Sequence, residues 1–155
     1  MRVAITETWQ RKIAAIKSIR RLVEFLAEAA GIRLNELSLV LVSNDGIIEI
    51  NKKHLRRDHI TDVISYLLPS FPGEKNLPSG EIFVNIQLAS NAKGRKGWNR
   101  SRELALYIAH GIDHLAGEDD ADRRGYLRMR RRELAWLRLA GEKGLLKGLM
   151  TKEKH

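Results

Sequence analysis

Residues 99–120 read NRSRELALYIAHGIDHLAGEDD. Asn99 is a suitable N-cap, and Glu103 lies near the positive end of the helix that would follow it. Core-facing residues recur at helical spacing, and they are Leu104, Tyr107, Ile108, Gly111 and Leu115. Gly117 can end this helix and let the chain turn back. The segment therefore predicts a helix over residues 99–115 that packs on a core. An acidic turn follows the end of this helix.

Two histidines stand on the flank of that stripe. His110 and His114 are spaced i,i+4, so they lie about 40° apart and one turn displaced on the helix. Such a pair can bind one metal ion, as in the zincin His-x-x-x-His arrangement. The run Glu118-Asp119-Asp120 would return to the same point. Two interpretations stay open: a metal site, or a helix end with solvated acids and partly buried histidines.

Gly111 occupies the position where a zincin protease carries its general-base glutamate. A peptidase mechanism would lack its base at this position. The sequence therefore disfavours a peptidase.

Apolar patterns on both sides of this segment predict the remaining elements. They predict helices over about 13–30, just after 44–46, from 87 to 92, and over 121–140, and strands over 37–43, 62–68 and 81–86. This order favours a single α+β domain, a small mixed β-sheet packed with helices that include a zincin-like metal helix. We expect the last helix to pack through Leu127, Leu134, Trp136 and Leu137, and residues 141–155 to form a loosely ordered tail.

The composition limits the class of protein. The 155 residues carry a net charge of +9 and no cysteine, which excludes disulfides and cysteine-ligated metal sites. The sequence shows no apolar run long enough to span a membrane and no signal peptide, so we expect a cytoplasmic protein without a membrane partner. The basic excess favours nucleic acid as a partner, and an ordinary solvated surface rich in arginine stays open as the alternative. No phosphate-binding glycine motif follows a strand, so a nucleotide cofactor is unsupported.

Residues 110–120, HGIDHLAGEDD, resemble the signature of the YbeY family, which reads His-Gly-x-Leu-His-Leu-x-Gly-Tyr-Asp-His. The matching positions are His110, Gly111, His114, Leu115, Gly117 and Asp119. Further family motifs occur in the same order at Ile50-Asn51, Thr61-Asp62-Val63-Ile64-Ser65, Gly80-Glu81-Ile82, Met129 and Glu133. The resemblance thus covers roughly residues 37–139.

The resemblance implies a metal-dependent endoribonuclease that acts on single-stranded RNA. Its expected roles are 16S rRNA 3′-end maturation and ribosome quality control, with rRNA or the ribosome as partner. The implied cofactor is one Zn²⁺ ion, held by His110, His114 and Asp120. Glu118 and Asp113 are candidate catalytic proton acceptors, and Arg56 and Arg57 are candidate RNA-binding residues.

Three positions of the signature depart from the family pattern, and upstream Leu55 stands where the family usually has an arginine. Asp120 stands where the family has its third metal-binding histidine, Asp113 where it has leucine, and Glu118 where it has tyrosine. Aspartate can bind zinc, but its charge weakens the ion as a Lewis acid and shifts preference toward harder ions such as Mn²⁺. Two alternatives therefore stay open: a non-catalytic RNA- or ribosome-binding factor with a degenerate metal site, and a hydrolase of another substrate.

Arginines crowd the predicted last helix. They are Arg123, Arg124, Arg128, Arg130, Arg131 and Arg132. We expect Arg123, Arg130 and Arg131 to lie on a different face from Arg128. Phosphate binding and ordinary solvated surface both stay open for this group.

Overall fold

The computed structural model describes residues 1–55, 58–70, 77–92, 98–118 and 120–151. Its strands are β1 (Arg2–Glu7), β2 (Glu36–Val42), β3 (Val63–Leu68) and β4 (Ser79–Asn85). Its helices are α1 (Ile16–Ala30), α2 (Asn44–Ile50), the π-helix η1 (Asn51–Leu55), α3 (Ile86–Ser90), α4 (Arg100–Leu115) and α5 (Arg123–Glu142). The helices and strands expected from residue 13 onward are all present, with shifted ends.

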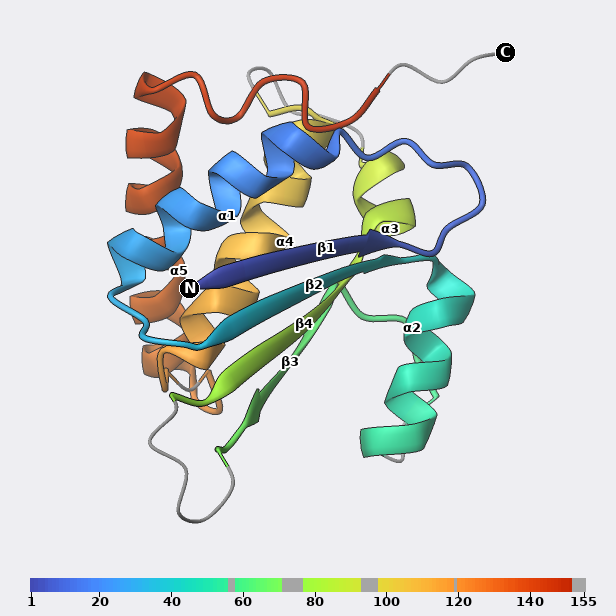
Figure 1. Cartoon of the computed structure of the whole chain (residues 1–155), viewed down its shortest axis with the longest axis horizontal. Coiled ribbons are helices and arrows are strands. Elements are labelled where there is room, and N and C mark those ends of the chain that lie inside the picture. The colour runs from blue at the N-terminus through green and yellow to red at the C-terminus, as the bar shows by residue number, and fades with distance from the viewer. Residues whose placement is uncertain (56–57, 71–76, 93–97, 119, 152–155) are drawn as a thin grey trace.

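The four strands form one mixed sheet with the order β1-β2-β4-β3 (Figure 1). The pairs β1–β2 and β2–β4 are parallel, and β3 pairs antiparallel with β4 at the edge. This is the expected α+β architecture. Strand β1, in which Val3 is buried and pairs with Leu37, was not predicted from the sequence pattern.

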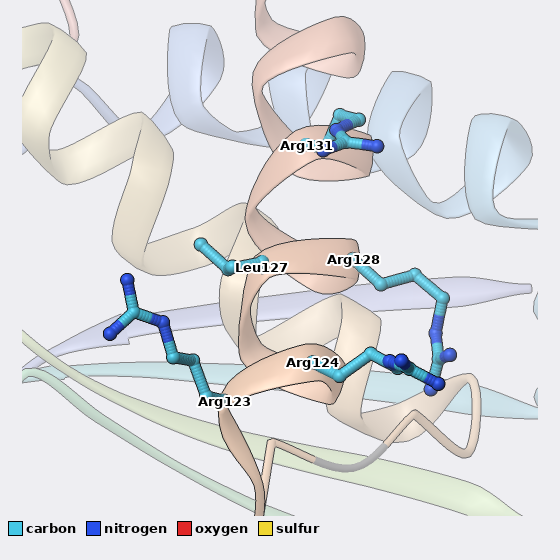
Figure 2. A pocket seen from close by; sticks show the side chains of 5 residues that line it. All are labelled: Arg123, Arg124, Leu127, Arg128 and Arg131. Atoms are coloured by element: carbon cyan, nitrogen blue, oxygen red, sulfur yellow. The ribbon is translucent and has the colours of Figure 1, made fainter.

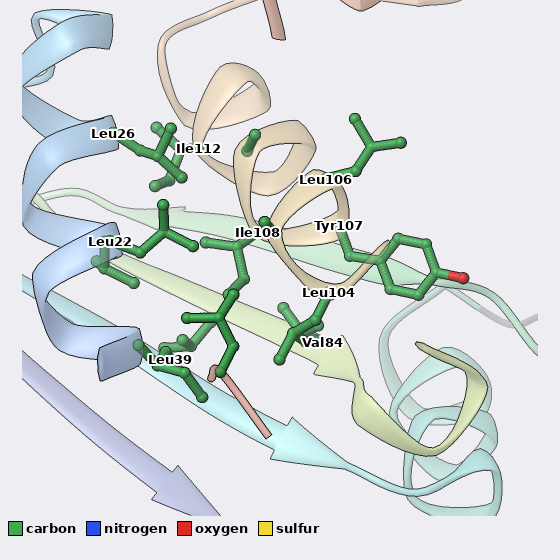
Figure 3. Packing of buried hydrophobic residues seen from close by; sticks show 14 of the residues in the cluster. Leu22, Leu26, Leu39, Val84, Leu104, Leu106, Tyr107, Ile108 and Ile112 are labelled. Carbon is green, nitrogen blue, oxygen red and sulfur yellow. The ribbon is translucent and has the colours of Figure 1, made fainter. Parts of the chain in front are cut away.

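Helices cover the two faces of the sheet unequally. The main core lies between the sheet and helices α1 and α4, where Leu22 and Leu26 of α1 pack toward Ile108 and Ile112 of α4 (Figure 3). A smaller cluster on the opposite face joins Ile47 of α2 to the sheet. Figure 1 shows α2 on the side of the sheet away from α1 and α4. The mixed sheet is therefore the middle layer between these helices.

Helix α4 is buried on more than one face. Every residue from Leu104 to Asp113 is buried, so burial extends beyond the expected stripe. Asn99 caps the helix as predicted, because its side chain accepts a hydrogen bond from the Arg102 amide at 2.9 Å. Gly111 lets the helix approach the sheet: a Cβ built there would lie 2.7 Å from Ile82 Cγ2 and 2.9 Å from Val63 Cγ2. This close approach leaves no room at position 111 for a protease glutamate.

Helix α5 packs differently from the prediction. Trp136 and Leu137 are buried as expected, but Leu127 and Leu134 are 46% and 42% exposed. The inward face instead carries Met129 and the charged Glu133. The expectation for Leu127 and Leu134 was wrong because α5 has apolar residues on two faces, and contact with α4 selects one of them.

Residues 143–151 follow α5 and return to the core. Leu146, Leu149 and Met150 are buried, and Met150 forms an isolated antiparallel bridge with Ala14. Among the described residues, no helix has the length and apolar content needed to cross a bilayer.

The close approach at Gly111 gives a stability prediction. Replacing Gly111 by alanine places a methyl group against branched side chains of the sheet, so we expect a loss of about 1–3 kcal/mol in the free energy of unfolding. Gly141→Ala, in helix α5, is the matched control. Its Cβ would meet Leu146 Cδ1 at 3.4 Å, an ordinary contact. This control should be neutral or stabilising by up to about 1 kcal/mol. Urea denaturation measures both, and equal stabilities would contradict the packing argument.

Candidate metal centre

Three potential ligand atoms converge at the end of α4. His110 and His114 project from its last two turns, and Asp120 lies in the segment between α4 and α5. The two Nε2 atoms are 3.1 Å apart. Asp120 Oδ2 lies 3.4 Å from His110 Nε2 and 3.7 Å from His114 Nε2. These three residues form a group that could hold a metal ion.

The spacing fits a small divalent cation. Ligands placed tetrahedrally at about 2.0–2.1 Å from zinc stand about 3.3 Å from each other. The observed separations of 3.1, 3.4 and 3.7 Å bracket that value. Two neutral imidazoles whose Nε2 lone pairs face each other also repel unless a cation or a proton lies between them. The donor set therefore suits a metal ion.

Glu133 orients the first histidine. Its Oε2 accepts a hydrogen bond from His110 Nδ1 at 2.8 Å, and its side chain is fully buried. Burial alone lowers the pKa of His110, but the hydrogen bond and negative charge of Glu133 outweigh it and raise the pKa. The charges of Asp62 and Asp120 act in the same direction. A proton held on Nδ1 leaves the Nε2 lone pair for a metal, the usual arrangement of a metal-binding histidine.

The turn after α4 orients the second histidine. His114 Nδ1 donates to the backbone carbonyl of Glu118 at 3.3 Å, which again leaves Nε2 free for a metal. Gly117 has φ of +94°, a conformation that favours glycine and lets the chain fold back over the helix end. The turn that the sequence predicted at Gly117 thus carries Asp120 toward the histidines.

The candidate proton acceptors Asp113 and Glu118 both contact Arg132. The Asp113 side chain is fully buried and pairs with Arg132 Nη2 at 2.8 Å, and Glu118 pairs with the same nitrogen at 3.3 Å. Burial, together with the neighbouring Glu133 carboxyl, raises the pKa of Asp113 to about 7 against the opposing effect of Arg132. A pocket opens beside the metal group, and neither Asp113 nor Glu118 is among the described residues that line it.

That pocket has a volume of about 490 Å³ and opens beside the metal group. Its lining comes mainly from β3 and the segment before it, and consists of Asn51, His59, Thr61, Val63, Ile64, Ser65, Tyr66, His114 and Asp120. Most of these residues carry hydroxyl, amide, imidazole or carboxylate groups. The pocket therefore suits a polar ligand lying between the metal group and the edge strand.

Two buried asparagines hold the segment that leads into β3. Asn51 Nδ2 donates to the carbonyl of His59 at 2.9 Å, and Asn85 Nδ2 donates to the carbonyl of Thr61 at 3.2 Å. The backbone N–H of Asn85 also donates to the backbone carbonyl of Asp62 at 2.8 Å. These bonds fix one wall of the pocket relative to β4.

The candidate RNA-binding residues Arg56 and Arg57, and the matching Asp119, lie outside the described residues. The sequence places Arg132 only among the arginines for which phosphate binding or solvated surface stays open, and its ion pairs with Asp113 and Glu118 were not predicted. Glu133 was noted as a motif position without a role. The spacing of Met129 and Glu133 was a usable signal for Glu133, but Arg132 had none, because its partners come from a different helix and from the following turn.

Comparison with known proteins places this chain in a family. The family model described as endoribonuclease YbeY matches residues 4–141. The chain belongs to the YbeY endoribonuclease family. This confirms the resemblance inferred from the ordered sequence motifs.

Relatives of the chain carry the same description. A Salinibacter ruber protein described as endoribonuclease YbeY is 32% identical over 125 residues, which cover 77% of this chain and 80% of the relative. An Elusimicrobium minutum protein with the same description is 42% identical over 88 residues, which cover 56% of this chain and 61% of the relative. A solution structure from Thermotoga maritima is similar in fold, with a TM-score of 0.59, 24% identity and 94% coverage of both chains.

The bond between Glu133 and His110 gives a prediction for metal binding. Glu133→Gln keeps the size of the side chain but removes the charge that favours the Nδ1-protonated ring, so zinc affinity should fall about 10- to 100-fold. Glu142→Gln, on the exposed end of the same helix, is the control and should leave the affinity unchanged. Competition with a chromophoric chelator measures both affinities. A Glu133→Gln protein that binds zinc as tightly as the parent, at equal thermal stability, would refute the orienting role.

Proposed function

We propose that this chain is a metal-dependent endoribonuclease that hydrolyses phosphodiester bonds of single-stranded RNA. One observation carries the proposal: in a member of this family, His110, His114 and Asp120 present three ligand atoms within 3.7 Å of each other beside a polar pocket. The relatives' description as endoribonucleases supports RNA as the substrate.

The three side chains would hold one divalent cation, with Zn²⁺ the first candidate and Mn²⁺ the second. Such an ion supplies Lewis acidity toward a phosphoryl oxygen and lowers the pKa of a bound water. Glu133 and the Glu118 carbonyl keep the two imidazoles in the tautomer that ligates through Nε2. Asp120 adds a negative charge to the site, which favours cation binding and accommodates the harder Mn²⁺ ion.

The pocket would receive the RNA strand next to the scissile bond. Its hydroxyl, amide and imidazole groups can hydrogen-bond to sugar and phosphate oxygens. In the sequence, Arg56 and Arg57 lie between two residues that line the pocket, Asn51 and His59, which supports them as phosphate-positioning residues. For Asp113 and Glu118, the pairing with Arg132 supports positioning of the turn more than proton transfer.

The family resemblance supports a specific biological role. We propose that the substrate is rRNA, that cleavage contributes to 16S rRNA 3′-end maturation and ribosome quality control, and that the ribosome is the partner. The net charge of +9 supports association with a polyanion of this kind.

Metal content and RNA cleavage together test the proposed function. The purified protein should contain about one equivalent of zinc or another divalent ion and should cleave a labelled single-stranded RNA. His114→Ala should abolish both, because it removes one of the three ligands. His54→Ala, at an exposed histidine on η1, should retain its metal. Elemental analysis and a gel-based cleavage assay give the two readouts.

The outcome separates the enzyme from the non-catalytic alternative. RNA binding without metal and without cleavage would identify an RNA-binding factor with a degenerate site and would overturn the proposal. Metal binding with cleavage of another phosphodiester but not of RNA would identify the hydrolase of a different substrate.

Substitution of Asp120 tests the third ligand directly. Asp120→His provides the family's usual third histidine, so zinc binding should tighten by about tenfold relative to manganese binding. Asp120→Asn keeps the shape but loses the charge, and zinc binding should weaken. Isothermal titration with each ion measures the change. If Asp120→Asn leaves zinc affinity unchanged, Asp120 is not a ligand.

A further inference from the structure

A second charged surface lies on α5, outside the metal centre. Arg123, Arg124, Arg128 and Arg131 surround Leu127 and line a depression of about 540 Å³ (Figure 2). All five residues are exposed. We call this surface the arginine face.

In the part of the chain that the structure describes, acidic side chains do not neutralise the arginine face. Among the described residues, none of its four guanidinium groups forms an ion pair with a carboxylate. The nearest acid in the sequence, Asp122, uses its carboxylate to cap α5 through the Gly125 amide at 2.6 Å. Glu133 of the same helix is buried against His110. The arginine face therefore carries a concentrated positive charge that is available to an external anion.

The arginines are spaced along the helix. Figure 2 shows Arg124 and Arg128 extending to the same side of α5, with Arg131 further along and Arg123 on the other side beyond Leu127. Arg124 and Arg131 are two turns apart, about 10 Å along the axis. The expectation that Arg131 lies on a different face from Arg128 was wrong, because a three-residue step returns within about 60° on a helix. The face thus presents a row of guanidiniums rather than one point charge.

The face also lies close to the metal group in the chain. Arg123 is three residues beyond Asp120, a span of at most about 11 Å even when extended. The backbone of the first arginine of α5 therefore lies within about 11 Å of the backbone of Asp120.

We infer that the arginine face binds the phosphate backbone of an RNA strand whose other part occupies the pocket at the metal group. This inference rests on the proposed function. Guanidinium groups bind phosphate oxygens through paired N–H donors. A row of guanidinium groups is more complementary to a polyanion with repeating charges than to one acidic side chain. The exposed Leu127 offers an apolar contact for a ribose or a base between the phosphates.

The test uses the full chain with three substitutions, Arg124→Gln, Arg128→Gln and Arg131→Gln. The matched control removes the same number of charges from exposed positions on α1 and beyond α5, as Lys17→Gln, Arg21→Gln and Lys147→Gln. Binding of polyuridine RNA of about five and about twenty nucleotides is measured across a salt titration. For the longer RNA, the arginine variant should bind at least about tenfold more weakly at low salt and should lower the salt slope by about 2. Binding and cleavage of the short RNA should stay as in the parent.

Each result separates this inference from the proposed function. If the arginine variant and the control bind the long RNA equally well, the inference is overturned even when the parent cleaves RNA. If the arginine variant loses binding of the long RNA while no variant or parent cleaves, the arginine face stands and the endonuclease proposal fails. If RNA binding is unchanged but binding of polyglutamate is lost, the face belongs to an acidic protein partner and the inference is overturned.

Discussion

The hydrogen bond between His110 Nδ1 and the buried carboxylate of Glu133 joins the two helices that build the site. A carboxylate without solvent contact is costly unless a partner compensates its charge. Here the partner is an imidazole whose pKa is raised mainly by that same carboxylate, against the effect of burial. The bond fixes the rotation of the His110 ring, and thereby directs Nε2 toward His114 and Asp120. The close packing of α4 at Gly111 then holds the ring at a constant position relative to β3.

The charges around this bond explain why a cation suits the site in an otherwise basic chain. Glu133 and Asp120 both contact His110, and Asp113 and Glu118 both pair with Arg132. Among the described residues, the other arginine near these four acids is Arg130, which lies 3.9 Å from Glu133. The raised pKa of Asp113, due first to burial and then to Glu133, reflects the crowding of acids in a space with little water. A divalent ion between the imidazoles and Asp120 would offset this excess. The local charge thus opposes the global charge of +9.

Local sequence patterns predicted those parts of the structure that depend on neighbours in the chain. The i,i+4 spacing of His110 and His114, the cap at Asn99 and the turn at Gly117 are of this kind, and each is present. Features that depend on distant partners could not be predicted. Strand β1 depends on its pairing with β2 more than on its own short alternation of apolar residues. The position of the Arg132 side chain depends on two acids, Asp113 of α4 and Glu118 of the following turn. In α5, the charged Glu133 is buried and Leu134 is exposed. Glu133 is buried because it bonds to His110 of another helix, and helical periodicity within α5 cannot reveal that partner.

Helix α5 also shows how one bond can constrain two surfaces. An α-helix that is fixed in rotation at one residue is fixed at all of them, because successive side chains are separated by about 100°. The rotation that places Glu133 against His110 also turns Met129 and Leu137 inward and leaves Arg124, Arg128 and Arg131 outward. The same choice exposes Leu127 and Leu134. The metal group and the arginine face are therefore not independent features of the surface: one rotation of α5 both brings Glu133 to the first candidate ligand and directs the arginines outward.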